Sequence, residues 1–390
     1  MKRPLKIALI AGEESGDILG ADLVAALREK AAGRDVEIIG VGGKHLAGQG
    51  LESLFDPSEI ALMGISAILA KLPRLFGLIC KTAAHVLAQK PDCLVIIDSP
   101  EFTHRVARKV RAADPSIPII NYICPSVWAW RPGRAKAMKA YVDHVLAILP
   151  FEPRVLAELG GPAATYVGHR LGQDPKILAA AASQKSLEPK RSAHGRKTIL
   201  VLPGSRNGEV ARHAPVFGET LGILAARGMN FEALLPVTDH LAPLVRSIIK
   251  DWPVKPLLIE GADAKFAAFG LADAALAASG TVTLELALSD VPTVACYRLD
   301  RLGQFVADHF VSVWSASLPN LIADAPVVPE FYDIYVRPQG LARHIEMLAN
   351  PGPARAAMLN GFASIRTAME TASPSGELAA EVVLRLARKA

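Results

Sequence analysis

The sequence has little that would hold a metal or form disulfides. Its 390 residues include only four cysteines, which lie far apart and form no C-x-x-C pair: Cys80, Cys93, Cys124 and Cys296. No histidine stands near them at a spacing typical of zinc sites. We therefore expect neither disulfides nor a structural metal, and we predict a protein of the reducing cytosol.

Long apolar runs are also missing. The most apolar stretch, residues 60–79, is interrupted by Lys71, Pro73 and Arg74, whereas a helix needs roughly 20 consecutive apolar residues to cross a bilayer. The apolar run at 7–11 is too short for a signal peptide and is followed at once by acidic residues. We expect no membrane span and no export signal.

Charge and composition are moderate and exclude the extreme protein classes. At 51% hydrophobic and 21% charged residues, the composition is that of globular proteins rather than disordered or fibrous chains. The net charge of +5 does not identify a partner, because exposed charges are screened beyond roughly 8 Å at physiological salt. It is compatible with an anionic lipid, a phosphate ligand or nucleic acid.

Short runs rich in valine and isoleucine alternate with helical patterns, which is typical of parallel strands in doubly wound α/β sheets. The predicted strands cover residues 7–12, 36–41, 93–98, 117–123, 144–150, 198–204, 231–237, 254–261, 274–279 and 292–298. We predict two Rossmann-like domains, at 1–173 and 198–390. A polar linker at 174–197 joins them, and the last stretch of the chain is helical.

Two glycine-containing turns each end a predicted strand and begin a helix. Backbone N–H groups at such a helix start can bind an anion. The first turn, AGEESGD at 11–17, taken alone favours a tight strand-to-helix turn over an anion site. The second, PGSRNGE at 203–209, carries Arg206, whose guanidinium suits a diphosphate; the alternative is an ordinary exposed loop.

A third turn, Ser279 to Thr281, follows the predicted strand at 274–279. Thr281 and Glu285 are four residues apart and therefore share one helix face. A carboxylate beside a phosphate site suits ribose hydroxyls. A helix cap with a solvated glutamate is the alternative.

Asp98 stands at the carboxyl end of the predicted strand 93–98, where α/β ligand sites lie. Ser99 and Pro100 already supply residues suited to a helix N-terminus. Asp98 is thus available as a general base, a role worth roughly 10²- to 10⁴-fold in rate. Its alternative role is to bond neighbouring backbone N–H groups.

Two further segments combine apolar or aromatic residues with cations. Trp128 and Trp130 stand beside Arg131, a combination that suits a lipid headgroup or sugar phosphate, single-stranded nucleic acid, or simple packing. The stretch 60–79 has the composition of a helix lying in a membrane surface, or of a buried core helix. Its candidate acyl or membrane contacts are Leu62, Met63, Ile68, Leu69, Leu72, Leu75 and Phe76.

Several motifs, taken in order, resemble those of the lipid-A-disaccharide synthase family. They are AGEESGDILGADL (11–23), GVGGKHLAGQGLESLFD (40–56), IALMG (60–64), IIDSPEF (96–102), PSVWAWRPGR (125–134), LPFE (149–152), YVGH (166–169), LPGSR (202–206), SGTVTLELAL (279–288) and LPNLIADAPVVPEF (318–331). Two residues depart from the family pattern, namely Glu14 at the place of a small residue and Arg170 at the place of a proline.

The resemblance implies a GT-B fold, with two Rossmann-like domains facing across a cleft. It implies an inverting hexosyltransferase that moves 2,3-diacylglucosamine from UDP-2,3-diacylglucosamine to 2,3-diacylglucosamine 1-phosphate. The products are a β-1,6 disaccharide 1-phosphate of lipid A biosynthesis and UDP. It implies no metal, no cofactor and no nucleic-acid partner, and a cytoplasmic enzyme bound peripherally to the inner face of the membrane.

The resemblance also assigns roles to residues. Asp98 would be the catalytic base. The donor would be bound by Ser205, Arg206, Ser279, Gly280, Thr281, Glu285 and Asn320. The acceptor would be bound by Gly12, Glu13, Ser15, Gly16, Asp17, Trp128, Trp130 and Arg131, with Glu13 and Asp17 as alternative bases.

Two other functions remain open from the residues alone. A UDP-sugar 2-epimerase of the same architecture would bind the same nucleotide, but it would not need an apolar surface for acyl chains. A non-catalytic protein that binds membranes or nucleic acid would use the basic N-terminal half and would not turn over a UDP-sugar.

Overall fold

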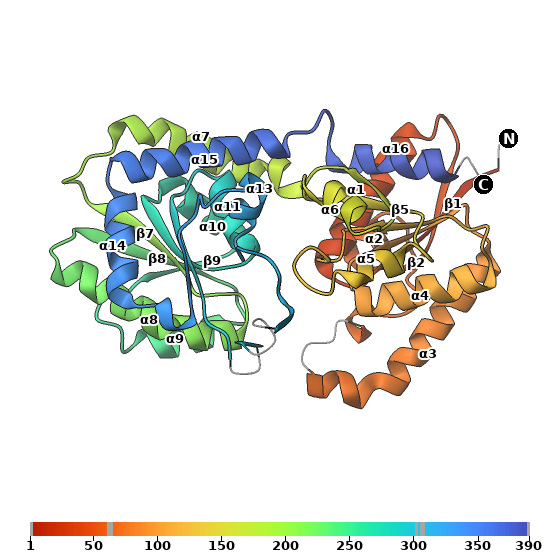
Figure 1. Ribbon diagram of the computed structural model, residues 1–390, viewed down its shortest axis with the longest axis horizontal. Coiled ribbons are helices and arrows are strands. Elements are labelled where there is room, and N and C mark those ends of the chain that lie inside the picture. The colour runs from red at the N-terminus through yellow and green to blue at the C-terminus, as the bar shows by residue number, and fades with distance from the viewer. Residues whose placement is uncertain (1–2, 61–64, 301–302, 305–308, 388–390) are drawn as a thin grey trace. The chain divides into compact units, whose positions relative to one another are not determined.

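The chain forms two compact units. The computed structural model describes residues 3–60, 65–300, 303–304 and 309–387, and it describes side chains outside 65–72. The first unit contains Met1–Arg170 together with Thr371–Ala390, and the second contains Leu171–Glu370. Each unit is a parallel sheet with helices on both faces (Figure 1).

The first sheet has six parallel strands in the order β2-β1-β3-β4-β5-β6. The strands are β1 (Leu5–Ala11), β2 (Val36–Val41), β3 (Cys93–Ile97), β4 (Ile119–Tyr122), β5 (His144–Ala147) and β6 (Ala163–Tyr166). The helices are α1 (Glu14–Lys30), α2 (Lys44–Gly48), α3 (Ile65–Gln89), α4 (Pro100–Ala113), α5 (Gly133–Met138), α6 (Glu152–Glu158) and α16 (Ser375–Ala387).

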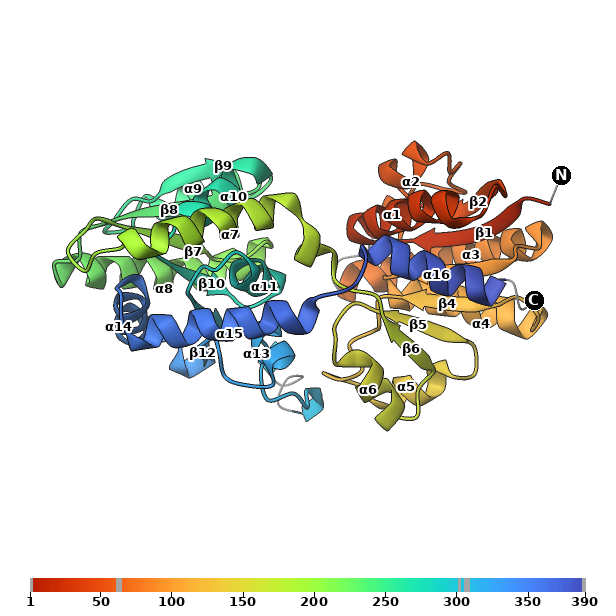
Figure 2. The same ribbon diagram turned by 90° about the horizontal axis from the view of Figure 1, so that it is seen from above.

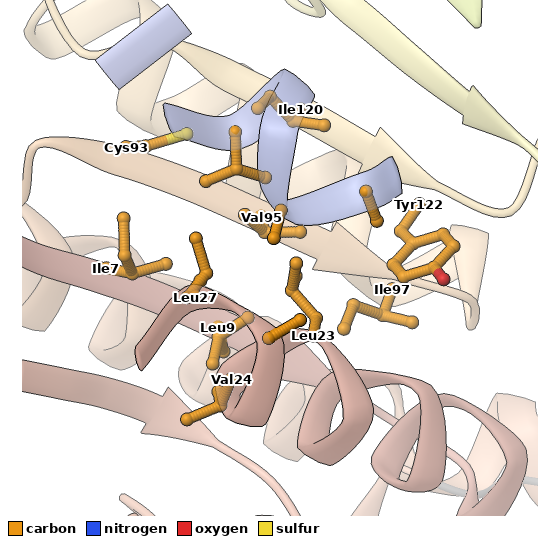
Figure 3. Close-up of a cluster of buried hydrophobic side chains, with 14 of the residues drawn as sticks. Ile7, Leu9, Leu23, Val24, Leu27, Cys93, Val95, Ile97, Ile120 and Tyr122 are labelled. Atoms are coloured by element: carbon orange, nitrogen blue, oxygen red, sulfur yellow. The ribbon is translucent and has the colours of Figure 1, made fainter. Parts of the chain in front are cut away.

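Apolar side chains fill both faces of the first sheet. On one face, α1 and α16 pack over β1, β3 and β4, and Leu23 and Leu27 of α1 meet Ile7, Leu9 and Val95 (Figure 3). On the other face, α3 and α4 cover the strands. Because both faces are buried, β3 is an unbroken apolar run rather than an alternating one.

The second sheet also has six parallel strands, in the order β12-β11-β10-β7-β8-β9. The strands are β7 (Lys197–Leu202), β8 (Phe231–Val237), β9 (Leu257–Glu260), β10 (Ala274–Ala278), β11 (Thr293–Tyr297) and β12 (Glu330–Tyr332). The helices are α7 (Pro175–Leu187), α8 (Asn207–Ala226), α9 (Ala242–Ile249), α10 (Ala262–Leu271), α11 (Thr281–Leu288), α13 (Leu318–Ala323), α14 (Pro338–Ala349) and α15 (Pro353–Met369). Short 3₁₀ turns occupy Pro57–Glu59, Arg170–Gln173, Glu188–Lys190 and Asp333–Tyr335.

Each sheet reverses its direction of strand addition beside its first strand. In the first sheet, β2 lies on one side of β1 and β3 to β6 on the other; in the second, β8 and β9 lie on one side of β7 and β10 to β12 on the other. In open α/β sheets, ligands bind beyond the carboxyl ends of the two strands that flank such a reversal. The fold therefore directs attention to the ends of β1 and β3, and of β7 and β10.

The structure divides the chain differently from the expected boundaries. Residues 174–197 are not a loose linker, because α7 packs on α10, where the Gln184 amide donates to the carbonyls of Phe269 and Ala272. The last helix, α16, belongs to the first unit and lies along α1 on the first sheet (Figure 2). Its buried Ala379 and Val383 complete that unit's core.

Candidate functional site

A cavity of about 750 Å³ lies at the carboxyl edge of the second sheet. Its wall includes the turn after β7, from Pro203 to Arg206, and the turn after β10, from Ser279 to Thr281. These turns begin α8 and α11, and their strands are hydrogen-bonded neighbours. The predicted second and third glycine turns therefore meet in one cavity, with two helix N-termini beside it.

The turn after β7 is held in shape by a buried histidine. His213 of α8 is fully buried, its Nδ1 lies 3.0 Å from the Pro203 carbonyl oxygen, and its Nε2 accepts from the Arg298 N–H at 3.0 Å. Burial lowers the pKa of His213. The ring is therefore neutral with its proton on Nδ1, and it donates to the turn.

Glu209, in the first turn of α8, folds back over this turn. Its carboxylate accepts from the Ser205 N–H at 3.1 Å and from Arg206 Nη1 at 3.0 Å. Gly204 makes room for it: φ there is +130°, and a Cβ would lie 2.6 Å from the Glu209 Cβ. Glu209 was not among the predicted site residues, although its place three residues after Arg206 is typical of a helix cap.

Glu285 lines the same cavity and forms an ion pair with Lys265 of α10. The Lys265 ammonium also lies 4.9 Å from the centre of the Phe266 ring and 5.4 Å from that of Phe269. Glu285 is thus not a solvated glutamate at a helix cap, the alternative that the sequence left open. Nothing in the sequence pattern pointed to Lys265, because it lies on a different helix.

Asn320 does not line this cavity. It is 1% exposed, and its side-chain amide exchanges two hydrogen bonds with the backbone of Val328, at 2.9 and 2.7 Å. In the structure this side chain fixes the segment between α13 and β12, and its donor-binding role stays a prediction. The LPNL motif alone does not distinguish an asparagine that binds a ligand from one that is buried and bonded to the backbone.

In the first unit, Asp98 follows β3 in a strained turn. Asp98 and Ser99 both have positive φ, at +52° and +44°, a conformation that costs energy for residues other than glycine and that clusters at functional sites. The Asp98 carboxylate accepts from the Ser99 N–H at 2.8 Å and lies 3.4 Å from Ser15 Oγ. Its second oxygen therefore faces the first glycine turn.

That glycine turn packs closely against the end of β3. A Cβ at Gly12 would lie 2.2 Å from Ser99 Oγ, and one at Gly16 would lie 3.6 Å from the Asp98 Cβ. A hollow of about 540 Å³ adjoins the turn, lined by Gly12, Glu13 and residues 42–44 among others. The structure thus brings Gly12, Ser15, Gly16 and Asp98 together.

Asp17, which was predicted to bind the acceptor, is among the residues that line this hollow, and its carboxylate also binds the neighbouring backbone. Asp17 is 3% exposed and accepts hydrogen bonds from the backbone N–H groups of Gly43, His45 and Leu46, at 2.6, 2.8 and 3.2 Å. It therefore fixes the start of α2. The neighbouring Glu14 pairs with Lys44 at 2.8 Å, and this hydrogen bond lowers the pKa of Glu14.

The tryptophan segment is anchored by a buried glutamate that the sequence analysis did not single out. Glu152 is 2% exposed and accepts from Trp128 Nε1 at 3.1 Å and from the N–H groups of Ile148 and Leu149 at 3.1 and 3.0 Å. Burial raises the pKa of Glu152 to about 7, against the lowering effect of these hydrogen bonds. Trp128, which is partly exposed, is thus held in place through its indole N–H.

Trp130 and Arg131 remain accessible beside the start of α4. Trp130 is 36% exposed, and the Arg131 guanidinium lies 4.3 Å from its ring centre. Arg134 donates to Glu101 at 2.6 Å, and Arg131 lies 4.0 Å from the same carboxylate. Burial acts to raise the pKa of Glu101, but Arg134 and its neighbours outweigh it and lower that pKa. Glu101 belongs to the first turn of α4, three residues after Asp98 in the chain.

The predicted membrane contacts have mixed outcomes. Leu62 and Met63 lie outside the described residues, as do the side chains of Ile68, Leu69 and Leu72. Leu75 is only 7% exposed and belongs to the core, which contradicts its prediction, because this side of α3 faces the sheet. Phe76 is 61% exposed. Among the described helices, none is long and apolar enough to cross a bilayer.

Sequence comparison connects this chain with a curated family. A family model described as lipid-A-disaccharide synthetase matches residues 7–358. Proteins named lipid-A-disaccharide synthase from Bradyrhizobium diazoefficiens and Rhodopseudomonas palustris are 46% and 47% identical over 385 and 386 residues. The matches cover 98% of this chain and 97% of each relative.

Solved structures of much lower identity share the fold. A structure of S. aureus MnaA with UDP has a TM-score of 0.58 at 16% identity, covering 97% of this chain and 94% of that one. A UDP-GlcNAc 2-epimerase from Neisseria meningitidis bound to UDP-GlcNAc has a TM-score of 0.57 at 14% identity, covering 99% and 100%. MurG of Acinetobacter baumannii has a TM-score of 0.54 at 14% identity, covering 100% of both chains. The fold is GT-B, with two Rossmann-like units.

Proposed function

Because the chain belongs to the lipid-A-disaccharide synthetase family and is a glycosyltransferase of lipid A biosynthesis, we propose its substrates and its chemical course. The donor is UDP-2,3-diacylglucosamine and the acceptor is 2,3-diacylglucosamine 1-phosphate. The products are the β-1,6-linked disaccharide 1-phosphate and UDP. Family membership confirms the resemblance seen in the motifs.

The observation that supports a nucleotide-sugar donor most strongly is the convergence of two turns on one cavity. Backbone N–H groups at the starts of α8 and α11, together with Arg206, suit the diphosphate. The carboxylate of Glu285, held by Lys265, suits the ribose hydroxyls. The volume of about 750 Å³ lies within the usual range for ligand pockets, about 300–1,000 Å³.

Asp98 is the proposed base. It takes the proton of the acceptor's 6-hydroxyl while that oxygen attacks the anomeric carbon of the donor sugar. The bond between the anomeric carbon and the diphosphate breaks, and UDP leaves with the electron pair. One displacement inverts the anomeric configuration. Arg206 and the N–H groups of the donor cavity stabilise the charge that develops on the leaving UDP.

Peripheral membrane contact is a further part of the proposal. The exposed Phe76 on α3, with Lys109 Nζ 5.1 Å from its ring centre, combines an apolar and a cationic group. Such pairs suit the boundary between acyl chains and headgroups. The acylated substrates would reach the enzyme from the cytoplasmic membrane surface.

The test is UDP release from UDP-2,3-diacylglucosamine in detergent micelles containing EDTA, with and without the acceptor. Wild type should release UDP only with acceptor. Asp98→Asn should lower kcat by about 10²- to 10⁴-fold and leave UDP affinity unchanged. Asp114→Asn, at the other end of α4, removes an equivalent charge from a partly exposed site and should behave as wild type.

Two outcomes would overturn the proposal. Release that ignores the acceptor would indicate hydrolysis, or an epimerase that frees UDP, rather than transfer. Full activity of Asp98→Asn would remove Asp98 as the base while leaving the donor site in place.

A further inference from the structure

The carboxylate of Glu209 lies where a donor phosphate needs to be. It accepts from the Ser205 N–H at 3.1 Å and from Arg206 Nη1 at 3.0 Å, and these are the groups to which the proposed function assigns the diphosphate. A carboxylate and a phosphate oxygen both accept charge-assisted hydrogen bonds of similar length. The two anions therefore compete for the same donors.

A helix cap alone does not account for this arrangement. In the usual capping box, the third residue of the helix accepts from the backbone N–H of the capping residue. Here Arg206 is the capping residue, but the carboxylate accepts from the residue before it and from the Arg206 side chain. Both groups line the cavity, as does Glu209 itself.

The residues around Glu209 leave room for its side chain to rotate away from the turn. Gly204 has no Cβ, which is what allows Glu209 to fold over the turn, and the side chain is 13% exposed toward the cavity. Arg206 is 63% exposed and carries no other ion pair among those seen in the described residues. A rotation of the Glu209 side chain releases both donors without breaking backbone structure.

We propose that Glu209 is a built-in competitor of the donor diphosphate: its carboxylate keeps Ser205 N–H and Arg206 aligned and is displaced when the nucleotide binds. This proposal rests on the donor site proposed above. The displacement weakens binding of UDP as well as of UDP-sugar, so it favours release of the product. The penalty is electrostatic, because a carboxylate left beside a diphosphate repels it.

The test is isothermal titration of UDP and of uridine into wild type, Glu209→Gln and Glu209→Asp. The amide of Glu209→Gln keeps a hydrogen-bond acceptor without charge, and the shorter Glu209→Asp withdraws the charge from the turn. Both should bind UDP about tenfold more tightly than wild type. Uridine has no phosphate, so its affinity should stay within about twofold. Glu219→Gln removes a charge from an exposed site on the same helix and should leave both affinities unchanged.

Each outcome decides one point. Equal or weaker UDP binding by both variants would overturn the proposal and leave Glu209 as a helix cap. Tighter binding of uridine as well as UDP would also overturn it, because the effect would not depend on phosphate. If wild type binds no UDP, the proposed donor site itself fails. Should Glu209→Gln not fold, as judged by its melting temperature, Glu209→Asp gives the same decision.

Discussion

Two buried carboxylates of the first unit and two cavity carboxylates of the second are held in different ways. In the first unit, Asp17 and Glu152 are buried and accept hydrogen bonds from backbone N–H groups and an indole. In the second unit, Glu209 and Glu285 line the cavity and pair with cationic side chains, Arg206 and Lys265, and Glu209 accepts from one backbone N–H as well. Both sheets are parallel, have six strands and reverse their strand order beside the first strand.

This difference distinguishes framework from binding site. Asp17 and Glu152 each accept from at least two backbone N–H groups, which cannot turn away without local unfolding, so these two buried carboxylates stay in place. A side-chain cation can rotate and exchange one anion for another. The second unit is therefore suited to reversible anion binding, whereas the first presents a rigid edge on which Asp98 is positioned.

The largest effect is expected when the carboxylate of Asp17 is removed, which tests whether this residue is structural. Asp17→Ala leaves three N–H groups of the α2 start, one buried and two partly buried, without an acceptor and should lower the free energy of unfolding by about 3 kcal/mol. The midpoint of urea unfolding, followed by circular dichroism, measures this. Asp22→Ala on the same helix, where the side chain is 47% exposed and lies 3.5 Å from Arg170, should cost under about 1 kcal/mol.

A stable Asp17→Ala protein that had lost turnover would reverse this assignment. Asp17 would then act in the chemistry, as the sequence analysis allowed, and the distinction between the two units would not hold.

The buried Glu152 of the first unit should make the free energy of unfolding depend on pH. Its pKa in the folded protein is raised to about 7, whereas in the unfolded chain it is about 4.3. As pH rises, the unfolded chain ionises first. The stabilising contribution is thus complete below about pH 4 and is lost by about pH 7, a fall of about 4 kcal/mol over the whole range.

The measurement is the difference in urea midpoint between wild type and Glu152→Gln at several values from pH 5 to 8. Other titrating groups cancel in this difference. Wild type should lose stability relative to the variant as pH rises, and Trp128 fluorescence should follow the same transition. A difference that is flat with pH would show that Glu152 ionises at an ordinary pKa.

The smallest effect is expected at Arg206, because its side chain is exposed. Arg206→Gln removes the charge that the donor phosphate would meet and should weaken UDP binding by about tenfold. The melting temperature should not change. Arg227→Gln, at the other end of α8 in an ion pair with Glu346 at 2.8 Å, is the matched control. Loss of stability without loss of UDP affinity would place Arg206 in the framework instead.

Much of the fold follows from local sequence. Strands β2 and β8 begin and end where the pattern of valine, isoleucine and leucine predicts, and α4 differs from its predicted range by one residue. Two strands were missed, β6 and β12, because they are short, partly exposed edge strands without a long apolar run. The helix α7 was mistaken for a linker because its alanine-rich pattern has little periodicity.

What the sequence by itself determined is the local chemistry: a turn with Arg206 after one strand, a turn with Ser279 and Thr281 after another, and Asp98 at the end of a third. Local patterns suffice there, since burial and turn propensity act over a few residues. Only the tertiary structure decided which residues meet. Pairing of β7 with β10 joins two distant turns in one cavity, and Asp17 binds a helix start 26 residues further along. Such contacts depend on how strands are ordered in a sheet, and the hydrophobic pattern is the same for many orders.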